Sequence, residues 1–179
     1  MDLPCFPLAE KGLTWNVTMK IKVFTTGGTI DKIYFDVKSE FQVGEPQIGQ
    51  LLHEANISFA YEVEPVLRKD SLDLTDGDRR LIVDKISSDL NQRILVTHGT
   101  DTMIETARML VMVRGKTIVL TGSMQPARLR ISDAVFNIGY AIAAVQLLPP
   151  GVYIAINGRV FDPHKTRKNV RLNQFESHA

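Results

Sequence analysis

The chain has 179 residues, of which 44% are hydrophobic and 23% are charged. This length suits one domain with a sizeable core, and the composition is typical of a globular protein, which argues against a disordered or membrane-embedded chain. The formal net charge is +1, with 21 basic and 20 acidic residues, so the charge does not favour a nucleic acid as partner. We therefore expect a small-molecule ligand that is neutral or zwitterionic.

The ends of the chain and its cysteine content bear on location and on metal binding. Residues 1–18 lack the basic start and apolar stretch of a secretory signal, and no apolar run reaches the roughly 20 residues of a membrane helix. We expect a cytoplasmic protein without membrane contact, with residues 1–18 as an N-terminal extension and residues 19–179 as the domain. Cys5 is the single cysteine and the four histidines lack paired ligand spacing, so we expect no metal and no cofactor.

The first half of the domain predicts a strand, a helix and a second strand. Residues 20–25 alternate, are rich in β-formers and run into two glycines, which indicates a strand that enters a tight turn. Behind Pro46, apolar residues recur at i, i+3, i+4 and i+7 through residue 55, which predicts an amphipathic helix. Residues 59–67 alternate again and predict the second strand.

The second half continues this alternation. Thr75 and Asp78 have the spacing of a capping box, and residues 75–91 then carry one apolar face, which predicts a helix. Strands at 93–97, 116–121 and 151–156 alternate with helices at 102–113 and 133–148. Regular alternation of this kind predicts an α/β fold in three layers, a mostly parallel sheet with helices on both faces.

Three of the predicted strands end in turns rich in glycine and hydroxyl side chains. These turns are TTGGT at 25–29, THGTD at 97–101 and TGSM at 121–124. Ligands of such sheets bind at the carboxyl ends of the strands, near the point where the strand order reverses. We therefore expect the three turns to converge on one pocket.

The first two turns offer candidate functional residues. Gly28 allows close backbone approach to a ligand and Thr29 adds a hydroxyl, although a tight turn with Thr29 as a helix cap has the same pattern. In the second turn Gly99 again allows close backbone approach to a ligand, and Thr100 and Asp101 place a hydroxyl beside a carboxylate. Asp101 could instead cap the following helix. We interpret His98, which precedes Gly99, as a structural histidine.

Threonine is a weak nucleophile, so the candidate hydroxyls need an activating group. A lysine near another cation or in a buried position can take up a proton at neutral pH, because both conditions lower its pKa. Lys165, Arg167, Lys168 and Arg171 crowd the segment after the last strand. The alternative interpretation of this segment is a solvated basic loop.

Three segments carry a resemblance to a known family. TTGGTIDK at 25–32, THGTDTMIETA at 97–107 and TGSMQP at 121–126 closely resemble bacterial L-asparaginases. The similarity runs from about residue 21 to about residue 175 and corresponds to the amino-terminal domain of full-length members, so the chain looks like the short-chain branch. The resemblance implies a single asparaginase-like catalytic domain that hydrolyses L-asparagine to L-aspartate and ammonia without a cofactor.

The same resemblance assigns roles to individual residues. It implies that Thr29 is the nucleophile, and that Thr100, Asp101 and Lys168 form the triad that activates the hydroxyl or the hydrolytic water. Ser71 matches the serine that binds the substrate's α-carboxylate, and Asp101 would also contact the α-ammonium group. We add the neighbouring Asp70 and the two glycines, Gly28 and Gly99, to the expected substrate-binding residues.

Two positions depart from the family pattern. The tyrosine that supports the nucleophile aligns with Phe41, which has no hydroxyl, and Tyr34 is the nearby phenol that could replace it catalytically. The alternative for Tyr34 is a packed aromatic side chain. Leu72 stands where many members have a polar residue that holds the substrate.

Several functions and assembly states remain open at this level. A glutaminase or dual-specificity amidohydrolase would have the same threonines, because one methylene is worth only about 1 to 3 kcal/mol in a pocket. A non-catalytic amino-acid-binding domain would explain the phenylalanine at position 41. A nucleotide-binding domain is disfavoured, because the sequence has neither a phosphate-loop lysine motif nor G-x-G-x-x-G. The apolar segment 134–148 favours a homo-oligomer, unless this helix is fully buried within the monomer.

Overall fold

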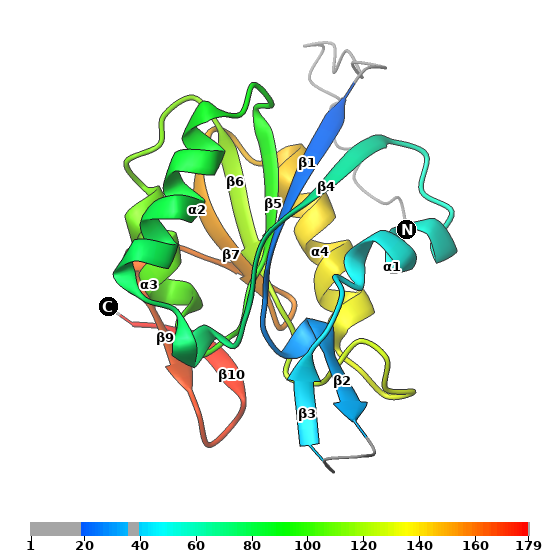
Figure 1. Ribbon diagram of the computed structural model, residues 1–179. Coiled ribbons are helices and arrows are strands. Elements are labelled where there is room, and N and C mark those ends of the chain that lie inside the picture. Colours follow the sequence, from blue (N-terminus) through cyan, green and yellow to red (C-terminus); the bar gives the residue numbers. More distant parts are fainter. Residues whose placement is uncertain (1–18, 36–39, 179) are drawn as a thin grey trace, which may run out of the picture.

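Five parallel strands and one antiparallel strand form the central sheet of the computed structural model, which describes residues 19–35 and 40–178 (Figure 1). In order across the sheet the strands are β4 (Ala60–Lys69), β1 (Lys20–Gly27), β5 (Arg93–Thr97), β6 (Thr117–Thr121), β7 (Gly151–Ile156) and β8 (Arg159–Phe161). Only β8 runs antiparallel to its neighbour. The predicted N-terminal extension, residues 1–18, lies outside the described residues.

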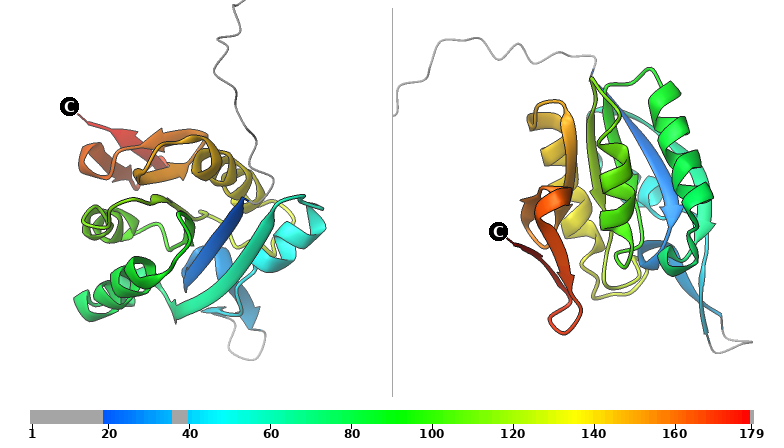
Figure 2. Two further views of the ribbon diagram at one scale, coloured as in Figure 1. Left: turned by 90° about the horizontal axis from the view of Figure 1, so that it is seen from above. Right: turned by 90° about the vertical axis from the view of Figure 1, so that its left-hand side faces the viewer.

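Helices cover both faces of this sheet, which confirms the predicted three-layer α/β fold (Figures 1 and 2). One face packs against α2 (Asp76–Ser88) and α3 (Met103–Leu110), and the other against α1 (Ile48–Glu54) and α4 (Ala134–Leu147). Two hydrophobic cores result, one on each side. Strands β5 and β6 are buried on both faces, which is why their sequences are nearly continuous apolar runs.

The helix boundaries follow local signals. The capping box of α2 is present, because the Thr75 hydroxyl accepts from the Asp78 N–H and the Asp78 carboxylate accepts from the Thr75 N–H. The predicted helix at 102–113 is too long, since α3 ends at Leu110 and the chain then turns towards Gly115, whose φ is +76°. The predicted helix at 75–91 is likewise three residues too long at its end, and the other predicted helices and strands agree with the structure to within two residues.

Several short elements were not predicted. Two hairpins, β2 (Lys32–Phe35) with β3 (Glu40–Val43) and β9 (Thr166–Asn169) with β10 (Gln174–Ser177), extend from the sheet. Three single turns of 3-10 helix follow strands: η1 (Thr29–Asp31), η2 (Ser71–Asp73) and η3 (Pro163–Lys165). These elements carry several of the candidate site residues.

Helix α4 is only half covered by the sheet. Its inner face is buried, with Ile138, Ala141 and Val145 in the core, while Phe136 and Leu147 are 61% and 69% exposed. The interpretation of this helix as fully buried within the monomer is therefore wrong.

Among the helices of the described residues, none has the length and apolar character needed to cross a lipid bilayer.

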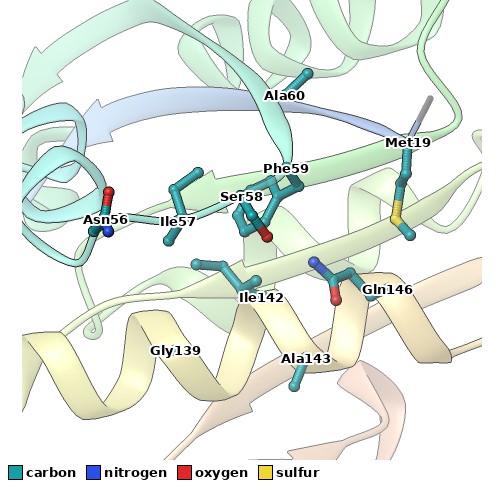
Figure 3. A pocket seen from close by; sticks show the side chains of 10 residues that line it. All are labelled: Met19, Asn56, Ile57, Ser58, Phe59, Ala60, Gly139, Ile142, Ala143 and Gln146. Carbon is teal, nitrogen blue, oxygen red and sulfur yellow. The ribbon is translucent and has the colours of Figure 1, made fainter. Parts of the chain in front are cut away.

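A surface groove of about 620 Å³ lies at the amino ends of the strands, between α4 and the segment 56–60 (Figure 3). Phe59 and Ile57 line one side, and Ile142 and Gln146 of α4 line the other. None of its lining residues in the described part of the chain is ionisable. The groove therefore lacks the acid and base groups of a catalytic site, and the candidate residues lie at the opposite ends of the strands.

Candidate active site

The strand order reverses beside β1. The chain passes from β1 to its neighbour β4 on one side, and then crosses back to β5 on the other side. In open α/β sheets this arrangement leaves a crevice outside the carboxyl ends of the two diverging strands. Here those strands are β1 and β5, whose following turns carry Thr29 and Thr100.

The turns after β1 and β5 are in direct contact through two glycines. A Cβ atom on Gly28 would lie 2.4 Å from both the Cα and the backbone nitrogen of Gly99. Gly28 also has φ +88° and ψ −172°, a conformation open essentially to glycine alone. Each glycine directly precedes a candidate threonine, so this contact brings the backbones of Thr29 and Thr100 to the same end of the crevice.

Thr29 begins the η1 turn and is half-buried. The N-cap of this turn is Gly28, so the interpretation of Thr29 as a helix cap is wrong. Within the described residues, its hydroxyl forms no hydrogen bond. A threonine hydroxyl in this position is available to a ligand in the crevice.

A lysine from the far end of the chain joins the second turn. The Lys168 ammonium group donates to the Thr100 hydroxyl at 2.8 Å and lies 2.6 Å from the Asp101 carboxylate. Its side chain is 13% exposed, and that of Asp101 is 40% exposed. The structure thus brings together the three residues of the expected triad.

The hairpin β9–β10 explains how Lys168 reaches this position. Lys168 pairs with Phe175 across the hairpin, and the Phe175 side chain is buried in the core. The backbone N–H of Phe175 also donates to the Asn157 side chain at 3.0 Å, which ties the hairpin to the turn after β7. Lys165 is exposed, so the interpretation as a solvated basic loop fits Lys165 but is wrong for Lys168.

Asp101 is not a helix cap. Helix α3 begins at Met103, its N-cap is Thr102, and no side chain caps it. The Thr102 hydroxyl instead donates to the Ser71 carbonyl at 2.7 Å, which joins the turn after β5 to η2. The Asp101 carboxylate is therefore free of the helix and pairs with Lys168.

Ser71 lies beside the two glycines. It is 1% exposed, and its hydroxyl has no hydrogen-bond partner within the described residues. A Cβ atom on Gly99 would lie 2.5 Å from this hydroxyl oxygen, so the serine is packed directly against the glycine. A buried polar group without a partner is costly, which makes this hydroxyl a candidate for ligand binding.

The neighbouring Asp70 is already engaged. Its carboxylate lies 2.6 Å from the Lys32 ammonium group and accepts from the Leu72 N–H at 3.2 Å, so it caps η2. Burial opposes ionisation of Asp70, but the hydrogen bond and charge of Lys32 outweigh it and lower the pKa of the carboxyl. The structure therefore shows Asp70 fixing the turn that carries Ser71. The Leu72 side chain is exposed.

Tyr34 and Phe41 face each other across the β2–β3 hairpin. They are register partners, and their ring centroids lie 5.5 Å apart in an edge-on arrangement. Tyr34 is 53% exposed, so its phenol is accessible from outside the hairpin. The phenol thus lies next to Phe41, the position that the resemblance predicts for the family's tyrosine.

His98 is a structural histidine, as predicted. It is fully buried, with Nδ1 2.8 Å from the Gly99 carbonyl and Nε2 2.8 Å from the Thr106 hydroxyl. Because a carbonyl can only accept, Nδ1 carries the proton and Nε2 accepts from Thr106. Burial lowers the pKa of His98 to about 4, although the hydrogen bond to Gly99 opposes this shift, so the imidazole is neutral.

The third turn supports the second. A Cβ atom on Gly122 would lie 2.3 Å from the His98 carbonyl and 3.4 Å from the Thr100 methyl group. The Asp133 carboxylate holds this turn by accepting from the N–H groups of Met124 and Gln125 at 3.0 Å. Sequence reasoning missed Asp133, because a carboxylate before a helix has the pattern of an ordinary N-cap. No group of three metal-ligating side chains was found among the described residues.

The family model described as "Asparaginase, N-terminal" matches residues 20–178, nearly the whole described chain. The chain belongs to the asparaginase family. It is 31% identical over 167 residues to an L-asparaginase of Thermococcus kodakarensis, an alignment that covers 89% of this chain and 51% of that protein. It is 30% identical to a glutaminase-asparaginase of Acinetobacter glutaminasificans, with coverages of 72% and 39%.

Solved structures of asparaginases share the fold. The thermostable L-asparaginase from Thermococcus kodakarensis superposes with a TM-score of 0.77 at 28% identity, over 89% of this chain and 51% of that chain. A probable cytoplasmic L-asparaginase from Campylobacter jejuni gives a TM-score of 0.77 at 27% identity, over 89% and 53%. The chain therefore spans about half the length of these relatives.

Proposed function

We propose that this chain hydrolyses the side-chain amide of L-asparagine to L-aspartate and ammonia. The observation that carries the proposal is the contact of Lys168 with both Thr100 and Asp101, on a turn packed against the one that bears Thr29. The contact joins residues 68 positions apart in the sequence and places an ammonium group beside the Thr100 hydroxyl. Family membership supports the same activity.

In the proposed reaction the Thr29 oxygen attacks the amide carbon of the substrate. Its proton passes to the leaving nitrogen, the C–N bond breaks and ammonia departs, which leaves an ester between Thr29 and the acyl group. A water then attacks this ester and passes its proton through the Thr100 hydroxyl to Lys168, which for this step must be the neutral amine, and Lys168 returns the proton to the Thr29 oxygen as the ester bond breaks. Aspartate is released and the Thr29 hydroxyl is restored.

The substrate would be held by groups around the two glycines. The unpartnered Ser71 hydroxyl can donate to the α-carboxylate, and the Asp101 carboxylate can accept from the α-ammonium group. Gly28 and Gly99 support the substrate site through their mutual contact, which brings the backbones of Thr29 and Thr100 to the same end of the crevice. Asp70 contributes by fixing the Ser71 turn through its ion pair with Lys32.

A glutaminase or dual-specificity amidohydrolase is the second candidate. Relatives named glutaminase-asparaginase match the chain at levels similar to those named L-asparaginase, for example 30% identity against 31%. A pocket discriminates one methylene by only about 1 to 3 kcal/mol, so the same catalytic groups serve either amide. The apolar Leu72 stands at the position where the resemblance predicts a polar contact with the substrate, so its side chain offers no hydrogen bond to either amide.

Ammonia release from asparagine, glutamine and their D-forms tests the proposal. We expect L-asparagine to be hydrolysed, and Thr29→Ala and Thr100→Ala each to lower turnover by at least roughly 10² while the fold is retained. A variant that keeps more than about a tenth of wild-type turnover would remove its threonine from the proposed chemistry. Asparagine binding without ammonia release by the wild-type protein would favour the non-catalytic binding domain instead.

We also propose a cytoplasmic homo-oligomer. The exposed strip of α4, defined here as the exposed Phe136, Ala143 and Leu147 with the half-buried Tyr140 between them, lies on one side of a helix that contains no charged residue. A second copy of the chain could pack against this strip without bringing like charges together. The cytoplasmic location is supported by the likeness to the probable cytoplasmic L-asparaginase of Campylobacter jejuni.

A further inference from the structure

Asp31 is a buried carboxyl group close to the candidate nucleophile that the proposed reaction does not use. It is the last residue of η1, two positions after Thr29, and is 1% exposed. Its backbone N–H donates to the Gly28 carbonyl at 3.1 Å, and its carbonyl accepts from the Gly44 N–H at 2.8 Å. The backbone of Asp31 therefore joins the η1 turn to the base of the β2–β3 hairpin.

The side chain of Asp31 reaches the start of α1. Its Oδ1 accepts from the backbone N–H of Gln47 at 2.8 Å, and Gln47 is the N-cap of a helix that lacks any side-chain cap of its own. Its Oδ2 is buried and has no hydrogen-bond partner in the described residues. A buried carboxylate is normally stabilised by several donors or by a cation, whereas this one has a single donor. The site therefore suits an uncharged carboxyl group.

Charged groups on the neighbouring elements are engaged elsewhere. Glu45, before α1, pairs with Arg68 at 2.6 Å, and Lys32, which follows η1, pairs with Asp70 at 2.6 Å. Arg128, on the loop before α4, donates to the Gln47 side chain at 2.8 Å. None of them bonds to Oδ2. Burial raises the pKa of Asp31 to about 7, against the opposing effect of the Gln47 N–H.

We propose that Asp31 is a positioning residue for Thr29, and that its uncharged carboxyl group is the form that holds the η1 turn against the start of α1. The proposal rests on the proposed role of Thr29 as nucleophile. Ionisation of a buried carboxyl with one donor is unfavourable, and opening the contact between η1 and α1 would let water reach the charge. Such an opening displaces the turn that begins with Thr29.

The dependence of stability on pH follows from the raised pKa. Below about pH 4 the carboxyl is protonated in both the folded and the unfolded chain, so this group causes no change of stability with pH. Between about pH 4 and pH 7 the folded state binds the proton more tightly, so stability falls as pH rises, and above about pH 7 the loss is complete. An asparagine side chain at this position would be uncharged at every pH and would keep an acceptor for the Gln47 N–H.

Thermal unfolding of Asp31→Asn tests the uncharged form without any assay of activity. We expect the midpoint to rise relative to wild type at pH 8, and this rise to exceed that at pH 5 by roughly 5 °C or more. Asp84→Asn is the matched control, because Asp84 is exposed on α2, and we expect no pH-dependent change there. Equal shifts for Asp31→Asn at the two pH values would overturn the proposal.

Kinetics and hydrogen exchange test the positioning role. We expect the wild-type kcat to decline as the pH rises through about 7, where Asp31 ionises. Asp31→Asn should keep kcat within about twofold of wild type at pH 6 and should lose this decline. Asp31→Ala removes the acceptor for Gln47, and we expect at least a tenfold loss of kcat with little change of KM. It should also speed amide exchange across residues 28–47 while leaving α3 unchanged.

Two kinetic outcomes would contradict this assignment. One is an alkaline decline that is the same in Asp31→Asn and wild type, and the other is an equal loss of kcat in the asparagine and alanine variants. If the wild-type protein hydrolyses neither amide, the proposed function fails. The unfolding and exchange measurements would then still decide whether Asp31 is uncharged and whether it holds the η1 turn.

Discussion

At the scale of single residues, Lys168 differs from the other basic side chains near it. It is largely buried and contacts both Thr100 and Asp101, whereas Lys165 is exposed. Both are lysines in the same basic segment, so residue type does not separate them, and the sequence singled out Lys168 only through the resemblance to asparaginases. The fold separates them by directing one side chain of the β9 strand to the crevice.

Replacement of these lysines by methionine tests the difference. We expect Lys168→Met to lower kcat by roughly 10² to 10⁴, because the neutral side chain cannot exchange a proton with Thr100. Lys165→Met is the matched control and should keep kcat within about twofold. Ammonia release with asparagine measures both variants. Equal losses would mean that the positive charge of the segment matters and that the contact with Thr100 does not.

Tyr34 carries the second prediction at this scale. Its phenol lies across the hairpin from Phe41, so it can serve the nucleophile only from the neighbouring strand. If it does, Tyr34→Phe should lower kcat by about tenfold or more, and the double variant Tyr34→Phe, Phe41→Tyr should recover part of that loss. An unchanged rate in Tyr34→Phe would leave Tyr34 as a packing partner of Phe41.

Helix caps and site residues have the same local pattern, and two interpretations failed for this reason. Thr29 and Asp101 both stand where a cap would stand, yet neither caps a helix. Thr75 has the same kind of pattern and does cap α2, because an acidic residue three positions later completes the box. Thr29 and Asp101, which are followed three positions later by Lys32 and Ile104, lack this reciprocal partner.

At the scale of elements, the contact between the turns after β1 and β5 decides the geometry of the site. We expect Gly28→Ala to destabilise the protein by roughly 3 kcal/mol or more, since its Cβ atom would overlap the Gly99 backbone and its φ would be strained. Gly115→Ala is the control, because Gly115 also has positive φ but has open space around it. That variant should cost only about 1 kcal/mol, from strain alone.

Denaturant unfolding of the two glycine variants measures this difference. A loss of stability of the same size in both would show that backbone strain accounts for the effect and that the contact with Gly99 contributes nothing. The activity of Gly28→Ala gives a second measure, because displacement of the turn moves Thr29. Gly115→Ala lies before β6 and should leave the rate unchanged.

The elements that sequence reasoning missed are the short ones. The strands β2, β3, β9 and β10 have four residues each, and η1 and η2 have three. A run of this length covers about one helical turn or two strand repeats, so it has no measurable periodicity. These elements nevertheless carry Thr29, Ser71 and Lys168, which became candidate residues through their motifs and not through the elements that hold them.

At the scale of the whole molecule, the exposed strip of α4 is the basis for the predicted oligomer. We expect light scattering to show a multimer, and Phe136→Glu and Leu147→Glu to shift it towards the monomer, because a charge would be buried between copies. Leu90→Glu is the control, since Leu90 is 96% exposed just after α2. A monomeric wild-type protein would contradict the prediction.

The sequence by itself determined the fold class and the identity of most candidate residues. Apolar runs and 3.6-residue periods are local properties, so the alternation of strands and helices, and with it a parallel sheet, could be predicted from segments such as 93–97. The threonine motifs at 25–32 and 97–107 were likewise sufficient for a resemblance to asparaginases, which the family model confirms.

Only the tertiary structure decided how these residues meet. Strand order is set by packing between distant segments, and it is the crossing from β4 to β5 that places Gly28 against Gly99. The same long-range packing brings Lys168 to Thr100 across 68 residues and buries Asp31 with one unpartnered oxygen. Local periodicity cannot predict such contacts, because their free energy depends on surfaces that form only when the chain has folded.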